Sequence, residues 1–480
     1  MQRVDKKQCV HSVIGLVIMF CGWFIPPVAP VTEVGMQLAG IFCGLVYLWS
    51  TVGMLWPSLL GIVAMLISDY ADTNTILAAA FAHFGVWTSV FMMAVFGVVE
   101  HYGVTAYITR YVLTRKVING RPWVFTFVWF FAIWLLSILN IGVAVIFMFW
   151  SLTYKLAEDL GYKKGDAYIN MMLFGTVIVN SLGGGYLPFM PWVVQISGIW
   201  QSMNGVVPFT YGQHLIMATF ISILTMLGYT ILMRFVFKVD VTPLKKIDAH
   251  YFDHDPLPPM NWLQKFLLAY IVLIIAVMFI PSLLPIEWTI TRILQKMGTI
   301  GISMVIFAVL CMIRQDGKSI INFQMLAGSK IIWDLVFLLC CVMAISSALT
   351  ADVTGVKPFL SGILAHIFNG MSGIVFFAVL LAVCLVLTNF ANNAVIALLL
   401  LSITSIMVAS MDLPNVGYVV TMLAFGSQIA YLIPGSSIYG AVAHGCDWLE
   451  PKFIYKMTVI VVAMVYVFFM LGWPLSLLIY

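Results

Sequence analysis

Charged side chains are scarce in this sequence. Of its 480 residues, only 9% are Asp, Glu, Lys or Arg, whereas a soluble globular domain carries roughly 25%. None of the four occurs in five long stretches, at 34–68, 122–154, 167–233, 359–411 and 457–480. Because a helix needs about 20 apolar residues to cross a bilayer, each stretch can hold at least one span. The composition excludes a water-soluble protein and predicts a polytopic protein embedded in the lipid bilayer.

Signatures of catalysis, metal binding and nucleotide binding are also lacking. The eight cysteines form neither a Cys-x-x-Cys motif nor a Cys/His cluster, so we expect no metal site. No Gly-x-Ser-x-Gly, His-Glu-x-x-His or nucleotide-binding motif is present. The sequence therefore predicts a protein that is not an enzyme and has neither a tightly bound cofactor nor a nucleic-acid partner. A membrane-embedded enzyme is the less favoured alternative.

The amino-terminal segment has the features of a retained helix. Arg3, Lys6 and Lys7 precede an uncharged run that reaches about residue 30. This run contains Trp23 and ends in prolines, whereas a signal peptide ends in small residues at a cleavage site. By the positive-inside rule, we expect a multi-pass protein of the cell membrane with a cytoplasmic amino terminus.

One hydrophilic interruption divides the chain into two halves, and weak repetition links them. We expect an amino-terminal helix at 1–33, a first inverted repeat at 34–238, a linker at 239–263 and a second repeat at 264–480. Three pairs of landmarks lie about 250 residues apart. They are Gly103-Val104 with Gly355-Val356, Asn140 with Asn393, and the polar break that begins at Asn180 with the polar break that ends at Ser437. The fold class that we predict is all-α, with about eleven transmembrane helices and two re-entrant hairpins.

Polar residues within the uncharged runs are the candidate site. Thr388, Asn389, Asn392 and Asn393 lie at the centre of 359–411, and an unpaired amide in hydrocarbon costs several kcal/mol. A hairpin tip would let them face a ligand beside a helix start, where partial positive charge accumulates. The alternative is that they only bridge helices through hydrogen bonds.

A second kind of break combines Gly, Ser and Pro at 180–191 and 427–437, as in the unwound helices of transporters. Gly183 and Gly184, followed by Gly185, could free carbonyl oxygens for a sodium ion, or they could allow close helix packing. Glu100 and His101 could relay protons, or they could be an interfacial pair.

These landmarks together resemble the divalent anion/sodium symporters, the dicarboxylate and citrate carriers of the ion transporter superfamily. Residues 388–394, Thr-Asn-Phe-Ala-Asn-Asn-Ala, resemble the family's Thr-x-Phe-x-Ser-Asn-Thr tip, and Ser137 to Ile141 occupies the place of the other tip. The resemblance implies an elevator-type homodimer. It also implies substrate contacts at Asn140, Thr388, Asn389, Asn392, Asn393, Ser436 and Ser437, and cation contacts at Ser137, Asn140, Gly183, Gly184, Thr388, Ala391 and Asn393.

Both tips depart from the family pattern. Leu139 and Asn392 replace the tip serines, and Ile141 and Ala394 replace the tip threonines. These changes remove hydroxyl ligands, so sodium, proton coupling and exchange all stay open. The sequence predicts a secondary transporter, symporter or antiporter, for a small organic anion, above all a di- or tricarboxylate. A cation/proton antiporter that uses Glu100 and His101 is the alternative.

Overall fold

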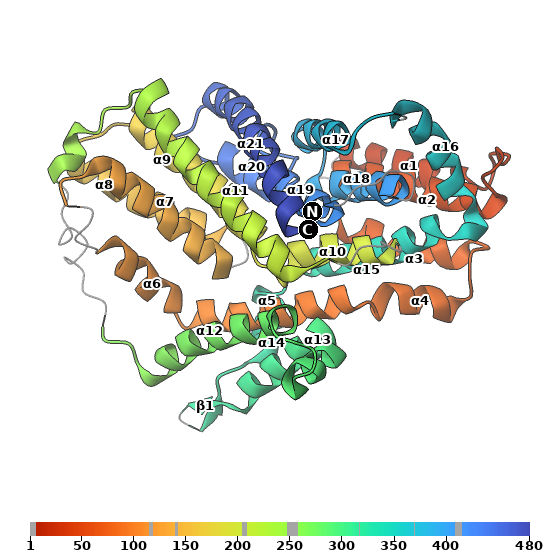
Figure 1. Ribbon diagram of the computed structural model, residues 1–480, viewed down its shortest axis with the longest axis horizontal. Coiled ribbons are helices and arrows are strands. Elements are labelled where there is room, and N and C mark those ends of the chain that lie inside the picture. Colours follow the sequence, from red (N-terminus) through yellow and green to blue (C-terminus); the bar gives the residue numbers. More distant parts are fainter. Residues whose placement is uncertain are drawn as a thin grey trace.

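The protein is almost entirely helical (Figure 1). The computed structural model describes residues 6–114, 119–139, 143–203, 209–246, 258–315, 317–368, 370–408 and 415–480. The first half contains α1 (Lys6–Cys21), α2 (Glu33–Thr51), α3 (Leu55–Ile67), α4 (Thr73–Phe81), α5 (Phe84–His101), α6 (Val104–Leu113), α7 (Pro122–Leu139), α8 (Ala144–Leu160), α9 (Ala167–Gly184), α10 (Pro191–Ser202), α11 (Tyr211–Ile231) and the short helices η2 (Leu232–Val236) and η3 (Thr242–Lys246).

The second half begins with two long helices and a small hairpin. Its elements are α12 (Trp262–Leu283), α13 (Thr289–Met312), β1 (Arg314–Gln315), β2 (Lys318–Ser319), α14 (Phe323–Ser329), α15 (Trp333–Thr350), η5 (Asp352–Thr354), α16 (Val356–Phe368), α17 (Gly373–Leu387), α18 (Asn393–Val408), α19 (Val416–Gly426), α20 (Ile438–His444) and α21 (Pro451–Ile479). The strands β1 and β2 pair antiparallel, with Arg314 opposite Ser319.

Side-chain caps mark where several helices begin. The Asp72 carboxylate accepts hydrogen bonds from the backbone N–H and the hydroxyl of Thr75, at 3.0 and 2.7 Å, and so starts α4. The Thr75 N–H that stabilises the carboxylate lowers the pKa of Asp72. Asn261 and Gln264 form a reciprocal capping box at the start of α12, directly after the hydrophilic segment.

Eight helical segments among the described residues are long and apolar enough to cross a membrane. One of them, Thr73–His101, combines α4 with α5, and another, Tyr211–Val236, combines α11 with η2. Shorter apolar helices, including α7, α17 and α18, add to them. The all-α membrane architecture agrees with the sequence analysis, whereas the number of eleven spans stays a prediction.

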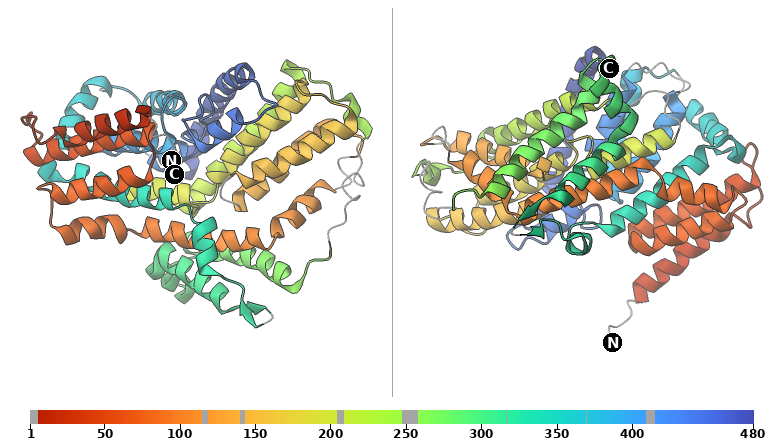
Figure 2. Two further views of the ribbon diagram at one scale, coloured as in Figure 1. Left: turned by 180° about the vertical axis from the view of Figure 1, so that it is seen from behind. Right: turned by 90° about the horizontal axis from the view of Figure 1, so that it is seen from below.

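Helices α9, α10 and α19 are largely enclosed by other helices, and Figure 1 shows α10 and α19 near the middle of the molecule. Every residue of α19 and every residue from Tyr168 to Gly183 of α9 is buried. Helices that are apolar on all sides suit such fully enclosed positions. Around them, α10 packs on α5, α15 and α18, and α19 packs on α11, α17 and α18. Figure 2 shows α12 and α13 lying alongside α5 on the outside.

Two local features recur at a spacing of about 250 residues. The Trp87 indole donates to the Phe81 carbonyl at 2.6 Å, and the Trp333 indole donates to the Ala327 carbonyl at 2.8 Å. Each indole lies beside a phenylalanine four residues later, with ring centroids 6.4 and 6.3 Å apart.

The paired glycine landmarks also match. Gly103 and Gly355 both adopt left-handed backbone conformations, with φ of 69° and 64°, and each directly precedes a helix. Both positions therefore demand the conformational freedom of glycine. Corresponding points of the two halves have the same local geometry.

Candidate functional site

The second predicted tip is a tight turn between two helices. Residues 388–392 connect α17 to α18, and the two helices pack on each other. Oδ1 of Asn392 accepts a hydrogen bond from the Ala394 N–H at 3.0 Å, which caps the start of α18. Ala391 is half-buried, and its N–H donates to the Leu387 carbonyl at 2.9 Å. The turn therefore exposes a helix start to the segment that follows α19.

Asn389 binds this turn to the second break. Its Nδ2 donates to the carbonyls of Leu385 and Ile429, at 2.8 and 2.7 Å. Its Oδ1 accepts from the N–H groups of Tyr431 and Leu432, at 2.9 and 3.0 Å. All four hydrogen bonds of the amide are made, so in this conformation Asn389 braces the break and has no atom left for a ligand.

The hydroxyl groups of the predicted site are used in the same way. Thr388 donates to the Ser427 carbonyl at 2.7 Å, and Ser436 donates to the Ile433 carbonyl at 2.7 Å. Ser437 donates to the Ala430 carbonyl at 2.6 Å and accepts from the Gly440 N–H at 3.0 Å, which caps α20. These contacts satisfy backbone groups that the loss of helix between α19 and α20 leaves open.

Asn393 and Gln428 leave polar atoms free at the helix start. The Asn393 N–H donates to the Ser436 carbonyl at 3.1 Å, and its Nδ2 donates to Oε1 of Gln428 at 3.3 Å. Gln428 is 5% exposed. Across the described part of the chain, Nδ2 of Asn392, Oδ1 of Asn393 and Nε2 of Gln428 have no hydrogen-bond partner. Two amide donors and one acceptor are thus available to a ligand.

Gln428 was missed by the sequence analysis. Its signal was present, because Ser427-Gln428 is a polar pair inside a run without charged residues. The sequence does not indicate that the pair would lie against the tip, since this contact depends on the course of the chain through the break.

The first predicted site is described only in part, because Asn140 lies outside the described residues. The Ser137 hydroxyl donates to the Ile133 carbonyl at 2.7 Å and accepts from Nδ2 of Asn180 at 2.7 Å. Oδ1 of Asn180 is buried and has no partner among the described residues. Several other buried polar atoms of the first half also lack a partner among the described residues, including both amide atoms of Gln195 on α10. The Asn180 oxygen is the one that lies beside the predicted first site.

The glycine run does not begin the first break where the sequence suggested. Helix α9 continues through Gly183 and ends at Gly184, with Gly185 as its C-cap. A Cβ on Gly183 would lie 2.3 Å from the Cβ of Ser137. Gly183 therefore allows α9 to approach the end of α7, while unwinding starts at Gly185.

Two tyrosines connect the halves. The hydroxyl groups of Ser181 on α9 and Tyr431 in the second break are hydrogen-bonded to each other. The Tyr439 hydroxyl on α20 lies 2.7 Å from the position of a Cβ on Gly184. Neither tyrosine was singled out from the sequence, because tyrosine in an apolar run does not differ from an ordinary core residue.

A buried imidazole joins the same region and was also missed. His214 on α11 is 0% exposed. Its Nε2 lies 3.1 Å from the Gly185 carbonyl oxygen, and its Nδ1 lies 3.1 Å from the Thr421 hydroxyl on α19. His214 is the sole histidine within the uncharged stretch 167–233, a signal that could have identified it.

Glu100 and His101 lie away from this buried region, at the end of α5. Glu100 forms an ion pair with Lys330 at 2.9 Å, and the two side chains are 27% and 24% exposed. His101 is exposed, and its ring is edge-on to Tyr102. This geometry suits the interfacial alternative, because both partners reach solvent.

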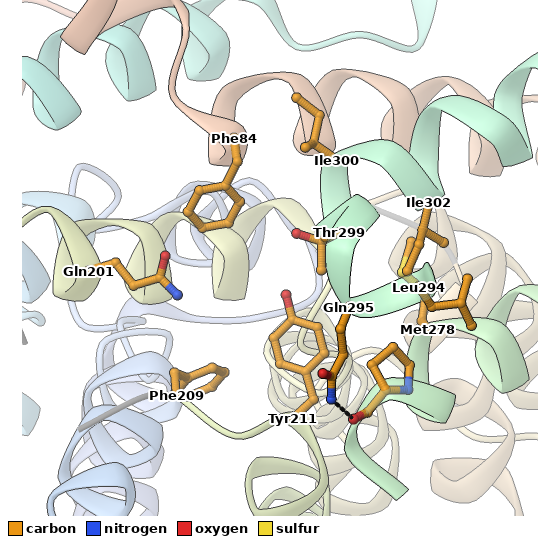
Figure 3. Close-up of a pocket in the computed structure, with 12 residues that line it drawn as sticks. Phe84, Gln201, Phe209, Tyr211, Met278, Leu294, Gln295, Thr299, Ile300 and Ile302 are labelled. Carbon is orange, nitrogen blue, oxygen red and sulfur yellow. Dashed lines mark hydrogen bonds between the residues drawn. The ribbon is translucent and has the colours of Figure 1, made fainter. Parts of the chain in front are cut away.

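A pocket lies in a different place, where α13 meets the turn between α10 and α11 (Figure 3). Its volume is about 540 Å³. Gly298 interrupts α13 there with φ 62° and ψ 179°. Tyr211 points toward Thr299, and Nε2 of Gln295 donates to the Pro281 carbonyl at 3.1 Å (Figure 3). The pocket lining contains amides, hydroxyls and aromatic rings but no charged residue.

Metal-binding clusters are not found among the described residues, since no three or more His, Cys, Asp and Glu side chains gather there. The polar atoms that the site does offer are amides, hydroxyls and backbone carbonyls. Oxygen ligands of this kind suit an alkali or alkaline-earth cation rather than a transition metal.

Comparison with known proteins identifies the fold. No family model matches the chain, and no curated protein matches its sequence. The YdaH transporter of Alcanivorax borkumensis is similar in structure, with a TM-score of 0.60, 11% sequence identity and coverage of 97% of each chain. MtrF of Neisseria gonorrhoeae, described among antimetabolite efflux pumps, has a TM-score of 0.59 and 12% identity, with coverage of 98% of this chain and 94% of MtrF.

The chain has the fold of these membrane transporters over nearly its whole length. At such low identity the likeness concerns the fold alone. It does not single out the divalent anion/sodium symporters, so the resemblance at 388–394 stays a prediction.

Proposed function

We propose that this chain is a secondary active transporter, not an enzyme, that moves a small organic anion of the di- or tricarboxylate class. The observation that carries the proposal is a pair of amide donors beside the start of α18, Asn392 Nδ2 and Gln428 Nε2, that have no partner among the described residues. Amide donors at a helix start suit a carboxylate. The transporter fold supports translocation as the activity.

The absence of fixed charge also supports an anion. Helices α17, α18 and α19 contain no Asp, Glu, Lys or Arg within their described lengths. A site built from amides and a helix start attracts an anion only moderately, so it can release the anion on the other side. This property suits a transporter better than a high-affinity receptor.

The finer proposals rest on the family resemblance. We place inverted repeats at 34–238 and 264–480, and the recurring Trp87 and Trp333 contacts support this division. The elevator motion, the homodimer and the cytoplasmic amino terminus belong to the same proposal. Sodium remains a candidate coupling ion.

A cation/proton antiporter is the second candidate, and one observation favours it. Oδ1 of Asn180 is a buried oxygen without a partner in the described structure, close to the break after α9. Carbonyl-type oxygens are the ligands that sodium and calcium prefer. The anion proposal and the cation proposal therefore differ in the sign of the charge that the buried site receives.

The substitution Gln428→Glu separates the two. It replaces the free amide donor by a carboxylate of almost the same shape, so an anion is repelled and a cation is attracted. In proteoliposomes, uptake of radiolabelled succinate and citrate should fall to background in Gln428→Glu and persist in the matched control Gln295→Glu in the α13 pocket. Absence of uptake of both anions by the parent protein, together with sodium/proton exchange that Gln428→Glu strengthens, would favour the antiporter.

A further inference from the structure

Each of the two helix breaks is held by one imidazole. His214 contacts the Gly185 carbonyl at the first break, and Nε2 of His444 lies 3.0 Å from the Leu432 carbonyl at the second. The two differ in their surroundings, since His214 is fully buried and His444 is half-buried. They also differ in their second nitrogen, because only His214 has a hydrogen-bond partner there within the described residues.

The partners of His214 determine its proton arrangement. A carbonyl oxygen can only accept, so Nε2 carries a hydrogen and donates it to Gly185. In the neutral ring, Nδ1 then accepts the hydroxyl hydrogen of Thr421. The Thr421 oxygen in turn lies 3.0 Å from the Tyr480 hydroxyl on the segment after α21. Three side chains thus form a continuous hydrogen-bonded row that ends at half-buried Tyr480.

We infer that His214 binds the proton that is coupled to transport, and that Tyr480 and Thr421 conduct the proton to it. The inference rests on the proposed function, since it names the coupling ion of the same transporter. Histidine is the side chain whose unperturbed ionisation falls between pH 5 and 8.

The proton transfer needs no movement of heavy atoms. A proton from water binds the Tyr480 oxygen, which passes its own hydrogen to Thr421, and Thr421 passes its hydrogen to Nδ1 of His214. Afterwards Nδ1 donates to Thr421, Thr421 donates to Tyr480, and Tyr480 donates to water. One positive charge has moved from water to the ring, and every polar atom in the row has a partner both before and after.

The surroundings of the ring show why this charge affects an anion. The ring lies between Phe209 and Phe425, with centroids 5.1 and 5.9 Å away. Helix α11 packs on α7, α9, α12, α19, α21 and η2. Among the described residues of these six elements there is no Asp or Glu, and their basic residues are Arg234, Lys265, Lys452 and Lys456. An imidazolium at this position therefore has no carboxylate on the packed elements to balance it.

The other titratable groups nearby are tyrosines that are occupied elsewhere. Tyr186 bonds to Thr219, Tyr229 to the Met171 carbonyl, Tyr418 to the Phe469 carbonyl, Tyr168 to Thr126, Tyr270 to the Ile306 carbonyl, and Tyr211 contacts Thr299. These phenols stay neutral at physiological pH. An anion at the tip is therefore the closest counter-charge that the site can receive.

The size of the effect follows from the distance. His214 bonds to Thr421, and the proposed anion lies at Gln428, seven residues further along the chain, which we convert to a separation of about 10 Å from the rise of a helix. At an effective dielectric constant of about 20, two unit charges at this separation change anion affinity by roughly tenfold. By linkage, the bound anion raises the affinity for the proton by the same factor.

The first test is the pH-gradient dependence of uptake. Proteoliposomes take up radiolabelled succinate with and without an inward proton gradient, and the ratio of the two rates is the readout. We expect a ratio well above one for the parent protein and close to one for His214→Gln, whose amide can still donate to Gly185. Tyr480→Phe and Thr421→Val interrupt the row and should lower the ratio as well. His444→Gln, the matched control at the other break, should keep the parental ratio whatever its rate.

A second test needs no substrate. Protein with isotope-labelled histidine is studied in liposomes by solid-state NMR, and the signal lost in His214→Gln identifies His214. Because burial disfavours the charged ring, we expect a neutral imidazole at pH 5 without ligand and a charged-imidazole signal that appears when succinate is added and that Tyr480→Phe leaves intact at equilibrium. A ring that stays neutral at pH 5 with and without succinate, or a His214→Gln protein with the parental gradient ratio, overturns the inference. Absence of succinate uptake together with a titrating His214 counts against the substrate proposal instead.

Discussion

Nδ2 of Asn393 donates a hydrogen bond to Oε1 of Gln428 across 3.3 Å. This contact joins the first residue of α18 to the segment where α19 has just ended. It also orients the Gln428 amide so that its carbonyl oxygen is occupied and its Nε2 is free. The helix start and the break therefore form one continuous polar surface, where we place the substrate.

The first prediction concerns this pair. Gln428→Ala should weaken succinate binding by roughly 10-fold to 150-fold, because a lost donor to a charged ligand is worth about 1.5 to 3 kcal/mol. Asn393→Ala should weaken it less, because it removes the contact that orients the Gln428 amide and not a free donor. The double variant should lose less than the sum, since each single change also disorients the partner. Isothermal titration calorimetry measures succinate binding by the parent, the two single variants and the double variant, each as monodisperse protein. Strict additivity would contradict the orienting contact, and binding by Gln428→Ala like the parent would place the substrate elsewhere.

Asn389 should behave differently from its neighbours, although it belongs to the same motif. Asn389→Ala removes four hydrogen bonds and leaves the buried N–H of Tyr431, at about 1–3 kcal/mol, and the half-buried N–H of Leu432 without their partner. We expect a clear drop in thermal stability in detergent, with loss of binding as a consequence. Asn392→Ala, which leaves fewer backbone groups open, is the matched control. A parental melting temperature in Asn389→Ala would contradict the bracing role.

The membrane character and the helical fold could be predicted from composition, because long uncharged stretches are buried in lipid, where a helix satisfies the backbone hydrogen bonds of its own segment. The landmarks at Gly103 and Gly355 could also be predicted, since left-handed backbone geometry favours glycine at both. The number of spans was harder to predict, because two separate helices, α4 and α5, together make one segment that is long enough to cross the membrane. Helix interruptions of this kind depend on tertiary packing more than on local sequence.

The roles of individual polar residues could be predicted only as a group. The sequence places Asn389 and Asn392 in one tip, but only the course of residues 427–437 decides that Asn389 is fully bonded and Asn392 is not. Gly183 was a candidate cation ligand from the glycine run, and its close approach to Ser137 depends on how α7 meets α9. His214 and Gln428 each stand out in the sequence as a polar residue in an uncharged run, but their partners depend on contacts between distant elements.

Sodium dependence should be weak, which is the third prediction. Among the described groups near the first break, the Ser137 hydroxyl is already engaged and Asn180 offers one free oxygen. A hard cation needs several oxygen ligands. Succinate uptake measured with sodium replaced by potassium or choline should change little. A steep dependence, with more than one sodium ion per substrate, would show that further oxygens complete the site.

The last prediction tests the contact between α7 and α9. Gly183→Ala places a Cβ 2.3 Å from the Ser137 Cβ and 2.9 Å from its carbonyl carbon, so the two helices must separate. Overpacking of this kind typically costs about 1–3 kcal/mol, and we expect a lower melting temperature and a weakened Asn180–Ser137 hydrogen bond. Gly362→Ala is the matched control, because Gly362 is exposed on α16 with nothing within 4 Å of an added Cβ, and alanine there should stabilise the helix by up to about 1 kcal/mol. Ser137→Gly removes the nearest clashing atom but not the backbone contact, so the double variant should recover only part of the loss. Full recovery would mean that the side chains alone set the distance, and no loss in Gly183→Ala would mean that α7 and α9 do not approach as closely as their backbones indicate.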